Sequence, residues 1–264
     1  MELIDTHAHL DMPPFDRDRQ EVIARALAAG VKTIVTVGID LKSSRKAIEL
    51  AESHPEVLAT VGVHPHEAAW VTKEDLVELA QIAKHPKVVA IGEMGLDFYR
   101  NRSPREAQFR IFRWQLELAR ELGLPVIIHS RQADKDTLNV LGEWVHSLPA
   151  TDKSIGVIHC FNSDKETALK YLDMDFFIAF GAYIGYPTST HLQDAIRAVA
   201  SDRLAVETDC PFLPPQIYRG KRNEPAYLPI TVGVLANVRR VSPGTVALET
   251  TQNACNLFRY PQSG

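Results

Sequence analysis

Short apolar runs alternate with amphipathic segments along almost the whole chain. The short runs are typical of strands buried on both faces of a parallel sheet, and the longer segments are typical of helices that pack one face against it. The predicted strands are residues 3–9, 32–37, 57–63, 88–92, 125–129, 155–159, 176–180 and 204–208. The predicted helices between them are residues 16–29, 43–53, 73–84, 104–122, 133–146, 165–173 and 191–200.

This alternation of about eight strands with helices favours a (β/α)8 TIM barrel. An open, doubly wound sheet is the structural competitor, but the glycine-rich dinucleotide fingerprint that would favour it is missing after the first strand. Residues 227–258 predict two further helices, with Ser242 as an N-cap and Pro243 as the first residue of the second helix. We therefore expect one TIM-barrel domain over residues 1–264 with extra C-terminal helices.

Composition is consistent with a barrel of this kind. The chain has 264 residues, of which 45% are hydrophobic, so a large core can be buried. The net charge of −4 gives no overall basic field for nucleic acid, although bound divalent cations would reverse the sign locally. Three widely spaced cysteines argue against a disulfide framework. With no leader-like or membrane-spanning apolar segment in the sequence, we expect a cytoplasmic protein without a membrane or an obligate protein partner.

Side chains of the kind that bind metals follow six of the predicted strands. In α/β barrels the C-terminal ends of the strands meet at one rim, where the active site lies. The residues at those ends are His7, His9, His64, His66, Glu93, His129, His159, Glu207 and Asp209. A partly buried polar side chain is an equally good explanation for any one of them alone. Their shared position at strand ends indicates a metal site.

This set of ligands is large enough for two divalent cations. Glu93 has two carboxylate oxygens and is the predicted bridge between a cation held by His7, His9 and Asp209 and a second held by His129 and His159. Two cations about 3.5–4 Å apart can activate a water and stabilise the oxygens of a phosphoryl transfer. Asp209 is the predicted proton acceptor, and Glu207, deeper on the same strand, is expected to hydrogen-bond a ligand. Zinc, manganese and magnesium all remain open.

Basic and aromatic residues lie near the same rim. Arg131 comes two residues after His129, and residues 219–223 carry three basic side chains. Guanidinium groups bind phosphate in a bidentate manner, although a solvated surface charge is the alternative for each arginine. Aromatic residues that follow strand ends would either stack on bases or pack at the rim; they are Phe98, Tyr99, Phe161 and Tyr183.

Seven motifs make the sequence similar to a known family. They are Ile4-Asp5-Thr6-His7-Ala8-His9-Leu10-Asp11, Gly62-Val63-His64-Pro65-His66, Ile91-Gly92-Glu93-Met94-Gly95-Leu96-Asp97, Val126-Ile127-Ile128-His129-Ser130-Arg131, Ile158-His159-Cys160-Phe161, Val206-Glu207-Thr208-Asp209-Cys210-Pro211-Phe212-Leu213 and Arg222-Asn223-Glu224-Pro225. Over nearly the whole chain the sequence resembles the TatD family of metal-dependent deoxyribonucleases, within the amidohydrolase-like barrels. The resemblance implies that the metal ligands are His7, His9, Glu93, His129, His159 and Asp209. It places His64, Arg131, Arg219 and Asn223 on the substrate side.

We therefore expect a divalent-metal-dependent phosphodiesterase that acts on DNA, and an exonuclease on single-stranded ends, as the family is known for. The alternative is a related hydrolase of an amide, a lactone or an ester, including an ester carried on a nucleic acid, because fold does not fix substrate. Two-metal barrels of that kind commonly use a carboxylated lysine as bridge, whereas Glu93 here favours phosphodiester chemistry. A metal-bound scaffold without turnover is disfavoured because every proposed ligand is present.

Overall fold

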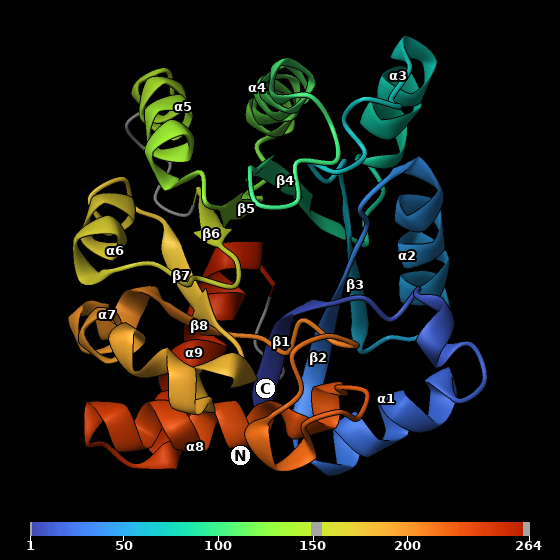
Figure 1. The fold of residues 1–264 in the computed structure, drawn as a ribbon. Helices are drawn as coiled ribbons and strands as arrows, with labels where there is room; N and C mark the ends of the chain where they lie inside the picture. Colours follow the sequence, from blue (N-terminus) through green and yellow to red (C-terminus); the bar gives the residue numbers. More distant parts are fainter. Residues whose placement is uncertain (1, 149–154, 261–264) are drawn as a thin grey trace.

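Eight parallel strands in chain order form the centre of the molecule, and helices surround them (Figure 1). The structure is a computed structural model that describes residues 2–148 and 155–260. Its strands are β1 (Leu3–Ala8), β2 (Val31–Val37), β3 (Val57–Val61), β4 (Val88–Asp97), β5 (Val126–Arg131), β6 (Gly156–Ile158), β7 (Phe177–Phe180) and β8 (Leu204–Val206). Each strand pairs in parallel with the next. The predicted (β/α)8 barrel is confirmed.

The helices occupy the predicted segments, with small shifts at their ends. They are α1 (Arg19–Ala28), α2 (Leu41–Ser53), α3 (Lys73–Ile82), α4 (Arg105–Leu122), α5 (Asp134–His146), α6 (Lys165–Leu172), α7 (Gln193–Ala198), α8 (Leu228–Arg239) and α9 (Pro243–Phe258). Ser242 caps α9 by accepting the backbone N–H of Thr245 at 3.0 Å, as predicted. Among the described residues, no helix is long and apolar enough to cross a membrane.

Alternate strand residues fill the inside of the barrel. Apolar side chains from β1 to β8 form one interior cluster, and residues of α9, including Leu257 and Phe258, pack into the same cluster. Asn253 of α9 donates to the carbonyl of Leu204, at the start of β8, so α9 covers the N-terminal end of the barrel. On three strands the inward residues Ile127, Val157 and Ala205 are followed two positions later by His129, His159 and Glu207. Because strand side chains alternate, these polar residues continue the inward face at the opposite, C-terminal mouth.

The barrel closes where the last strand meets the first. Ala8 and Cys210 form a parallel bridge, the N–H of Asp209 donates to the carbonyl of His7 at 2.9 Å, and the N–H of His9 donates to the carbonyl of Cys210 at 2.8 Å. Closure therefore brings residues at the two ends of the sequence, His7 and His9 on one side and Asp209 on the other, to one place.

Two predicted boundaries were wrong. The strand expected to end at Gly92 continues to Asp97, so Glu93 lies inside β4. Gly92 and Gly95 both have positive φ and bring β4 close to β5. The helix expected over residues 191–200 is a 3-10 helix, Pro187–Leu192, followed by the short α7.

A cluster of charged residues joins α1 to the segment that follows β8. Arg222 donates to both carboxylate oxygens of Asp18 and to Glu224, each at 2.7 Å. Arg25 also donates to Glu224, at 2.8 and 2.9 Å. The hydrogen bonds from Arg222 lower the pKa of Asp18 from 3.8 to about 2. The cluster therefore favours the folded state only while Asp18 is ionised.

Replacing Arg222 with Gln should lower the free energy of unfolding by about 1 kcal/mol at pH 7. This is less than the pKa shift alone would give, because Asp18 is one-third exposed and solvent screens the pair. The folded-state pKa is the lower one, so the stabilisation is present above about pH 4 and is lost as the pH falls toward 2. Urea unfolding of both proteins at several pH values between 7 and 3 measures the difference. Arg197→Gln, which removes an exposed pair with Asp194, is the control. A difference that stays constant down to pH 3 would contradict the proposed origin.

Candidate metal centre

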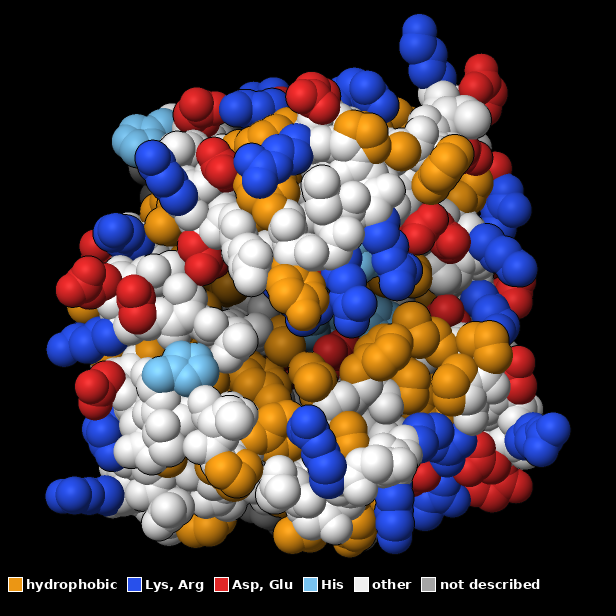
Figure 2. Space-filling model, viewed as in Figure 1, with side chains coloured by type: hydrophobic (Ala, Val, Ile, Leu, Met, Phe, Trp, Pro, Cys, Tyr) orange, Lys and Arg blue, Asp and Glu red, His pale blue; other side chains and the backbone are white. Residues whose placement is uncertain are grey.

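Five imidazoles and two carboxylates converge at the C-terminal mouth of the barrel. They belong to His7, His9, His64, His129, His159, Glu93 and Asp209. The cavity above them has a volume of about 710 Å³. Figure 2 shows this face of the molecule, with a central hollow that has acidic and histidine side chains at its bottom and basic and hydrophobic side chains around its rim.

One oxygen of Glu93 faces the histidines of the first strand. Glu93 Oε2 lies 3.5 Å from His7 Nε2 and 3.8 Å from His9 Nε2. The two Nε2 atoms are 3.3 Å apart. Asp209 Oδ1 completes this group at 3.4 Å from His9 Nε2 and 3.9 Å from His7 Nε2. The group is the one predicted for the first cation.

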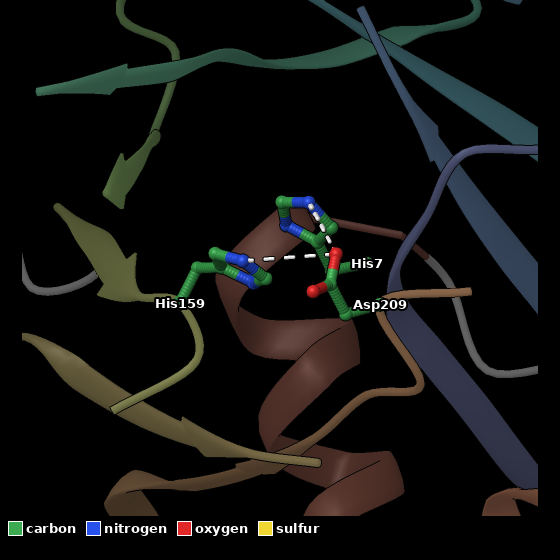
Figure 3. A group of neighbouring side chains, drawn as sticks. All are labelled: His7, His159 and Asp209. Atoms are coloured by element: carbon green, nitrogen blue, oxygen red, sulfur yellow. Dashed lines mark ion pairs between the residues drawn. The ribbon is translucent and has the colours of Figure 1, made fainter. Parts of the chain in front are cut away.

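The other oxygen of Glu93 faces the histidines of later strands. Glu93 Oε1 lies 2.7 Å from His129 Nδ1, 3.6 Å from His64 Nε2 and 3.7 Å from His159 Nε2. His159 also lies 3.9 Å from Asp209 Oδ1, and its ring stacks on that of His7 (Figure 3). It therefore contacts both groups. His64, expected on the substrate side, is placed inside the cluster beside Glu93 and His129.

Local backbone geometry places both carboxylates. Gly92 has φ +139°, and a Cβ there would lie 2.6 Å from the carbonyl oxygen of Ile127, so only glycine fits between β4 and β5. Thr60 donates its hydroxyl to the Gly92 carbonyl, and the N–H of Glu93 donates to the Gly38 carbonyl at 3.1 Å. Asp209 has φ +55°, a left-handed conformation that is uncommon for residues other than glycine and clusters at functional sites.

Hydrogen bonds from outside the cluster orient the imidazoles. His9 Nδ1 lies 3.1 Å from the Val37 carbonyl, which leaves Nε2 to face Glu93 and Asp209. His159 Nδ1 lies 2.9 Å from Glu207 Oε2, and Glu207 Oε1 accepts the N–H of Cys160 at 2.7 Å. Glu207 was expected to hydrogen-bond a ligand, and its partner here is His159, one of the predicted ligands.

Sequence reasoning missed Asp97. Its Oδ2 lies 3.2 Å from His129 Nε2 and 2.9 Å from His66 Nε2. Asp97 follows Glu93 by four positions on β4, and the even spacing would have placed it on the same face had the strand been extended beyond Gly92.

Burial and mutual contacts shift the pKa values of the cluster in opposite directions. Burial alone would raise the pKa of Glu93, but the surrounding imidazoles, His64 and His159 first, hold it well below its usual range. Burial lowers the pKa of His64 well below 6.5. Burial would also lower the pKa of His159, but Glu207 and Glu93 raise it to about 10. These buried carboxylates therefore strongly favour positive charge beside them.

The cluster fits divalent cations. Imidazole nitrogens with carboxylate oxygens are a donor set that zinc and manganese accept. Most of the distances from the Glu93 and Asp209 oxygens to the imidazole nitrogens are longer than a good hydrogen bond. Two atoms that bind one cation at about 2.1 Å in a tetrahedral arrangement lie about 3.4 Å apart, which is close to these distances. Within residues 2–148 and 155–260, Glu93 and Asp209 have no ion pair with lysine or arginine, so a cation could balance their charge.

Comparison with known proteins gives the family. Residues 4–259 match the family model described as "TatD related DNase". The chain belongs to the TatD family. A Bacillus subtilis protein named "uncharacterized metal-dependent hydrolase YabD" is 40% identical over 97% of this chain and 99% of its own. A Salmonella typhimurium protein named "3′-5′ ssDNA/RNA exonuclease TatD" is 34% identical over 97% of this chain and 98% of its own.

A solved TatD-family structure has the same fold. The crystal structure of YJJV, a TatD homologue from Escherichia coli K12, is 31% identical and matches with a TM-score of 0.92 over 98% of both chains. The recognition made from the motifs is confirmed, and the chain is a metal-dependent hydrolase of the TatD family.

The residues predicted to lie on the substrate side of this TatD-family chain differ in how close they are to the cavity. Arg131 lines the cavity, and its guanidinium lies 4.1 Å from the centre of the Tyr99 ring. Arg219 is exposed and lies over the ring of Tyr186, which lines the cavity. Arg100 and Arg102 also line the cavity and were missed, because the loop between β4 and α4 gave no strand-end signal.

Asn223 is not placed where it could touch a substrate. It is fully buried, and its amide donates to the carbonyls of Thr208 and Phe212 at 2.8 and 2.7 Å. These bonds fix the turn that carries Asp209. The expectation that Asn223 binds substrate directly is therefore replaced by a structural role in that turn.

Of the rim aromatics, Phe161 and Tyr183 line cavities but are buried, and the Tyr183 hydroxyl donates to the Phe161 carbonyl. Tyr99, in contrast, is 52% exposed. It is the member of the predicted set best placed to stack on a base.

Replacing Glu207 with Gln should lower the affinity for zinc by about 10- to 100-fold, because His159 loses the carboxylate that orients its ring. Titration of the metal-free protein against a competing chelator measures this without reference to activity. Glu143→Gln, an exposed acid on α5, is the matched control. Unchanged zinc affinity in the Glu207 variant, with the fold intact, would show that this hydrogen bond does not support metal binding.

Proposed function

We propose that this TatD-family hydrolase is a divalent-metal-dependent phosphodiesterase that acts on DNA and removes nucleotides from single-stranded ends. The observation that carries the proposal is Glu93, whose two oxygens face two separate groups of possible ligands below a rim of arginines. The name of the Salmonella relative, a 3′-5′ ssDNA/RNA exonuclease, supports the same substrate class.

Each group of ligands would hold one cation. His7, His9 and Asp209 would bind the first, and His129 and His159, together with the neighbouring His64, would bind the second, with Glu93 shared between them. Bound divalent cations supply Lewis acidity and make water a competent nucleophile at neutral pH. Zinc, manganese and magnesium are the ions to test.

The chain's own residues supply the proton acceptor and the positioning of the substrate. Asp209 lines the cavity and presents a carboxylate that accepts the proton of the attacking water. Arg100, Arg102 and Arg131 line the same cavity, and none forms an ion pair within the described ranges. Their guanidinium groups are therefore available to bind phosphates next to the scissile one. This local positive charge offsets the net charge of −4, and so binding of DNA needs no basic face.

The runner-up is a hydrolase of an amide, a lactone or an ester on the same scaffold. Three arginines at the mouth favour a polyanion over an uncharged substrate of that kind. No lysine is among the described residues that line the cavity, so a carboxylated lysine has no place there as a bridge.

Hydrolysis of an end-labelled single-stranded DNA oligonucleotide tests the proposal. Metal-stripped protein should be inactive, and magnesium, manganese or zinc, added separately, should restore shortening from one end. Glu93→Gln should lower kcat by at least about 100-fold with every metal, because both ligand groups lose their shared carboxylate. Metal content measured on the same samples separates loss of metal from loss of chemistry. If the DNA stays intact with every metal while members of an ester or amide panel are hydrolysed, the alternative hydrolase function is favoured instead.

The arginine rim should also control the salt dependence of binding. Arg100→Gln and Arg102→Gln should each raise KM for single-stranded DNA several-fold at low salt. Each should reduce the slope of log KM against log salt concentration by about 0.7, the value for one phosphate contact on a single strand. Arg113→Gln, an exposed arginine paired with Glu143 away from the cavity, is the control. An unchanged slope in both rim variants would exclude phosphate contacts there.

A further inference from the structure

A second cavity adjoins the metal centre. Its volume is about 410 Å³, within the range of small-ligand sites. Ser130, Arg131 and Asn162 line both this cavity and the metal cavity, so the two lie side by side at the end of β5. A chain whose phosphate lies at the metal centre can therefore extend across Arg131 into the second cavity.

The entrance to the second cavity has the side chains that single-stranded nucleic acids use. Tyr99 lines it with a half-exposed ring, and the Arg131 guanidinium lies over that ring at 4.1 Å. Exposed aromatic rings stack on bases, and arginine binds the neighbouring phosphate. The pair thus fits one nucleotide next to the scissile phosphate.

The lining of the second cavity also carries a carboxylate with unused hydrogen-bonding capacity. Asp134 Oδ1 accepts the hydroxyl of Ser130 at 2.8 Å and that of Tyr171 at 3.4 Å, which fixes the orientation of the group. In the part of the chain described, Oδ2 has no hydrogen bond and Asp134 has no ion pair with a basic side chain. An ionised carboxylate accepts hydrogen bonds and donates none, so its partner must present N–H groups.

We propose that the second cavity holds the nucleobase next to the scissile phosphate and that Asp134 selects bases with an amino group, guanine first. Guanine presents an amino group beside a ring N–H, and the two lone pairs of the free Oδ2 can accept both. Adenine and cytosine present one amino group beside an acceptor. Thymine presents one N–H between two carbonyls, which repel a carboxylate. This inference rests on the proposed nuclease function, since it assigns a base preference to that reaction.

The test uses single-stranded oligonucleotides with a dT body and two identical bases at each end, either dG, dA, dC or dT. With the metal-loaded protein, kcat/KM for the first cuts should be about five- to tenfold higher for dG ends than for dT ends, the discrimination of one good base contact. Asp134→Asn should reduce this ratio to below about twofold, because the carboxamide offers a donor as well as an acceptor. Asp136→Asn, in the same first turn of α5 but outside the cavity lining, should keep the wild-type ratio.

Binding of dGMP and dTMP, measured by calorimetry on the same metal-loaded proteins, separates the two proposals. DNA hydrolysis with equal rates for all ends, or with a ratio unchanged in Asp134→Asn, would overturn the base pocket and leave the nuclease function standing. Absence of hydrolysis together with Asp134-dependent preference for dGMP would overturn the nuclease function and leave the base pocket standing. Absence of both hydrolysis and preference would overturn both. Thermal unfolding of each variant shows whether a lost preference reflects a lost fold.

Discussion

A buried carboxylate among imidazoles is the constraint on which the rest of the structure depends. Glu93 is 3% exposed, and its charge is compatible with that burial only because nitrogens surround both oxygens. Those nitrogens come from β1, β5 and the ends of β3 and β6, so the barrel must close for the charge to be balanced. The glycine at position 92, the Thr60 hydroxyl and the Gly38 carbonyl serve the same end, since they fix where Glu93 stands.

Charge is distributed by depth at the mouth of the barrel. Carboxylates and imidazoles lie at the bottom, guanidinium groups lie at the rim, and the net charge of the chain is negative. A polyanion is therefore attracted locally rather than by the whole surface. The same separation keeps the arginines from pairing with Glu93 and Asp209, which would otherwise lose their capacity to bind cations.

The fold and the proposed ligands were predictable because they follow from periodicity. A strand places every second residue on one face, so His129 and His159 could be read from the apolar residues before them. Asp97 was missed because the backbone at Gly92 and Gly95 breaks the pattern that would extend β4. Arg100 and Arg102 lie in a loop, where no period applies. The family resemblance placed Asn223 on the substrate side, and the sequence does not show that its amide is already bonded to carbonyls.

Among the described residues, helix α9 closes the end of the barrel that lies opposite the cavity. Its apolar side chains seal the N-terminal end of the barrel, directly beneath the interior residues of the strands. A polymer therefore cannot be threaded through the barrel, and it can reach the bottom of the cavity only with a free end or a sharp bend. Under the proposed function, the product of each cut must leave by the route along which the polymer entered. The product must therefore depart before the polymer can advance.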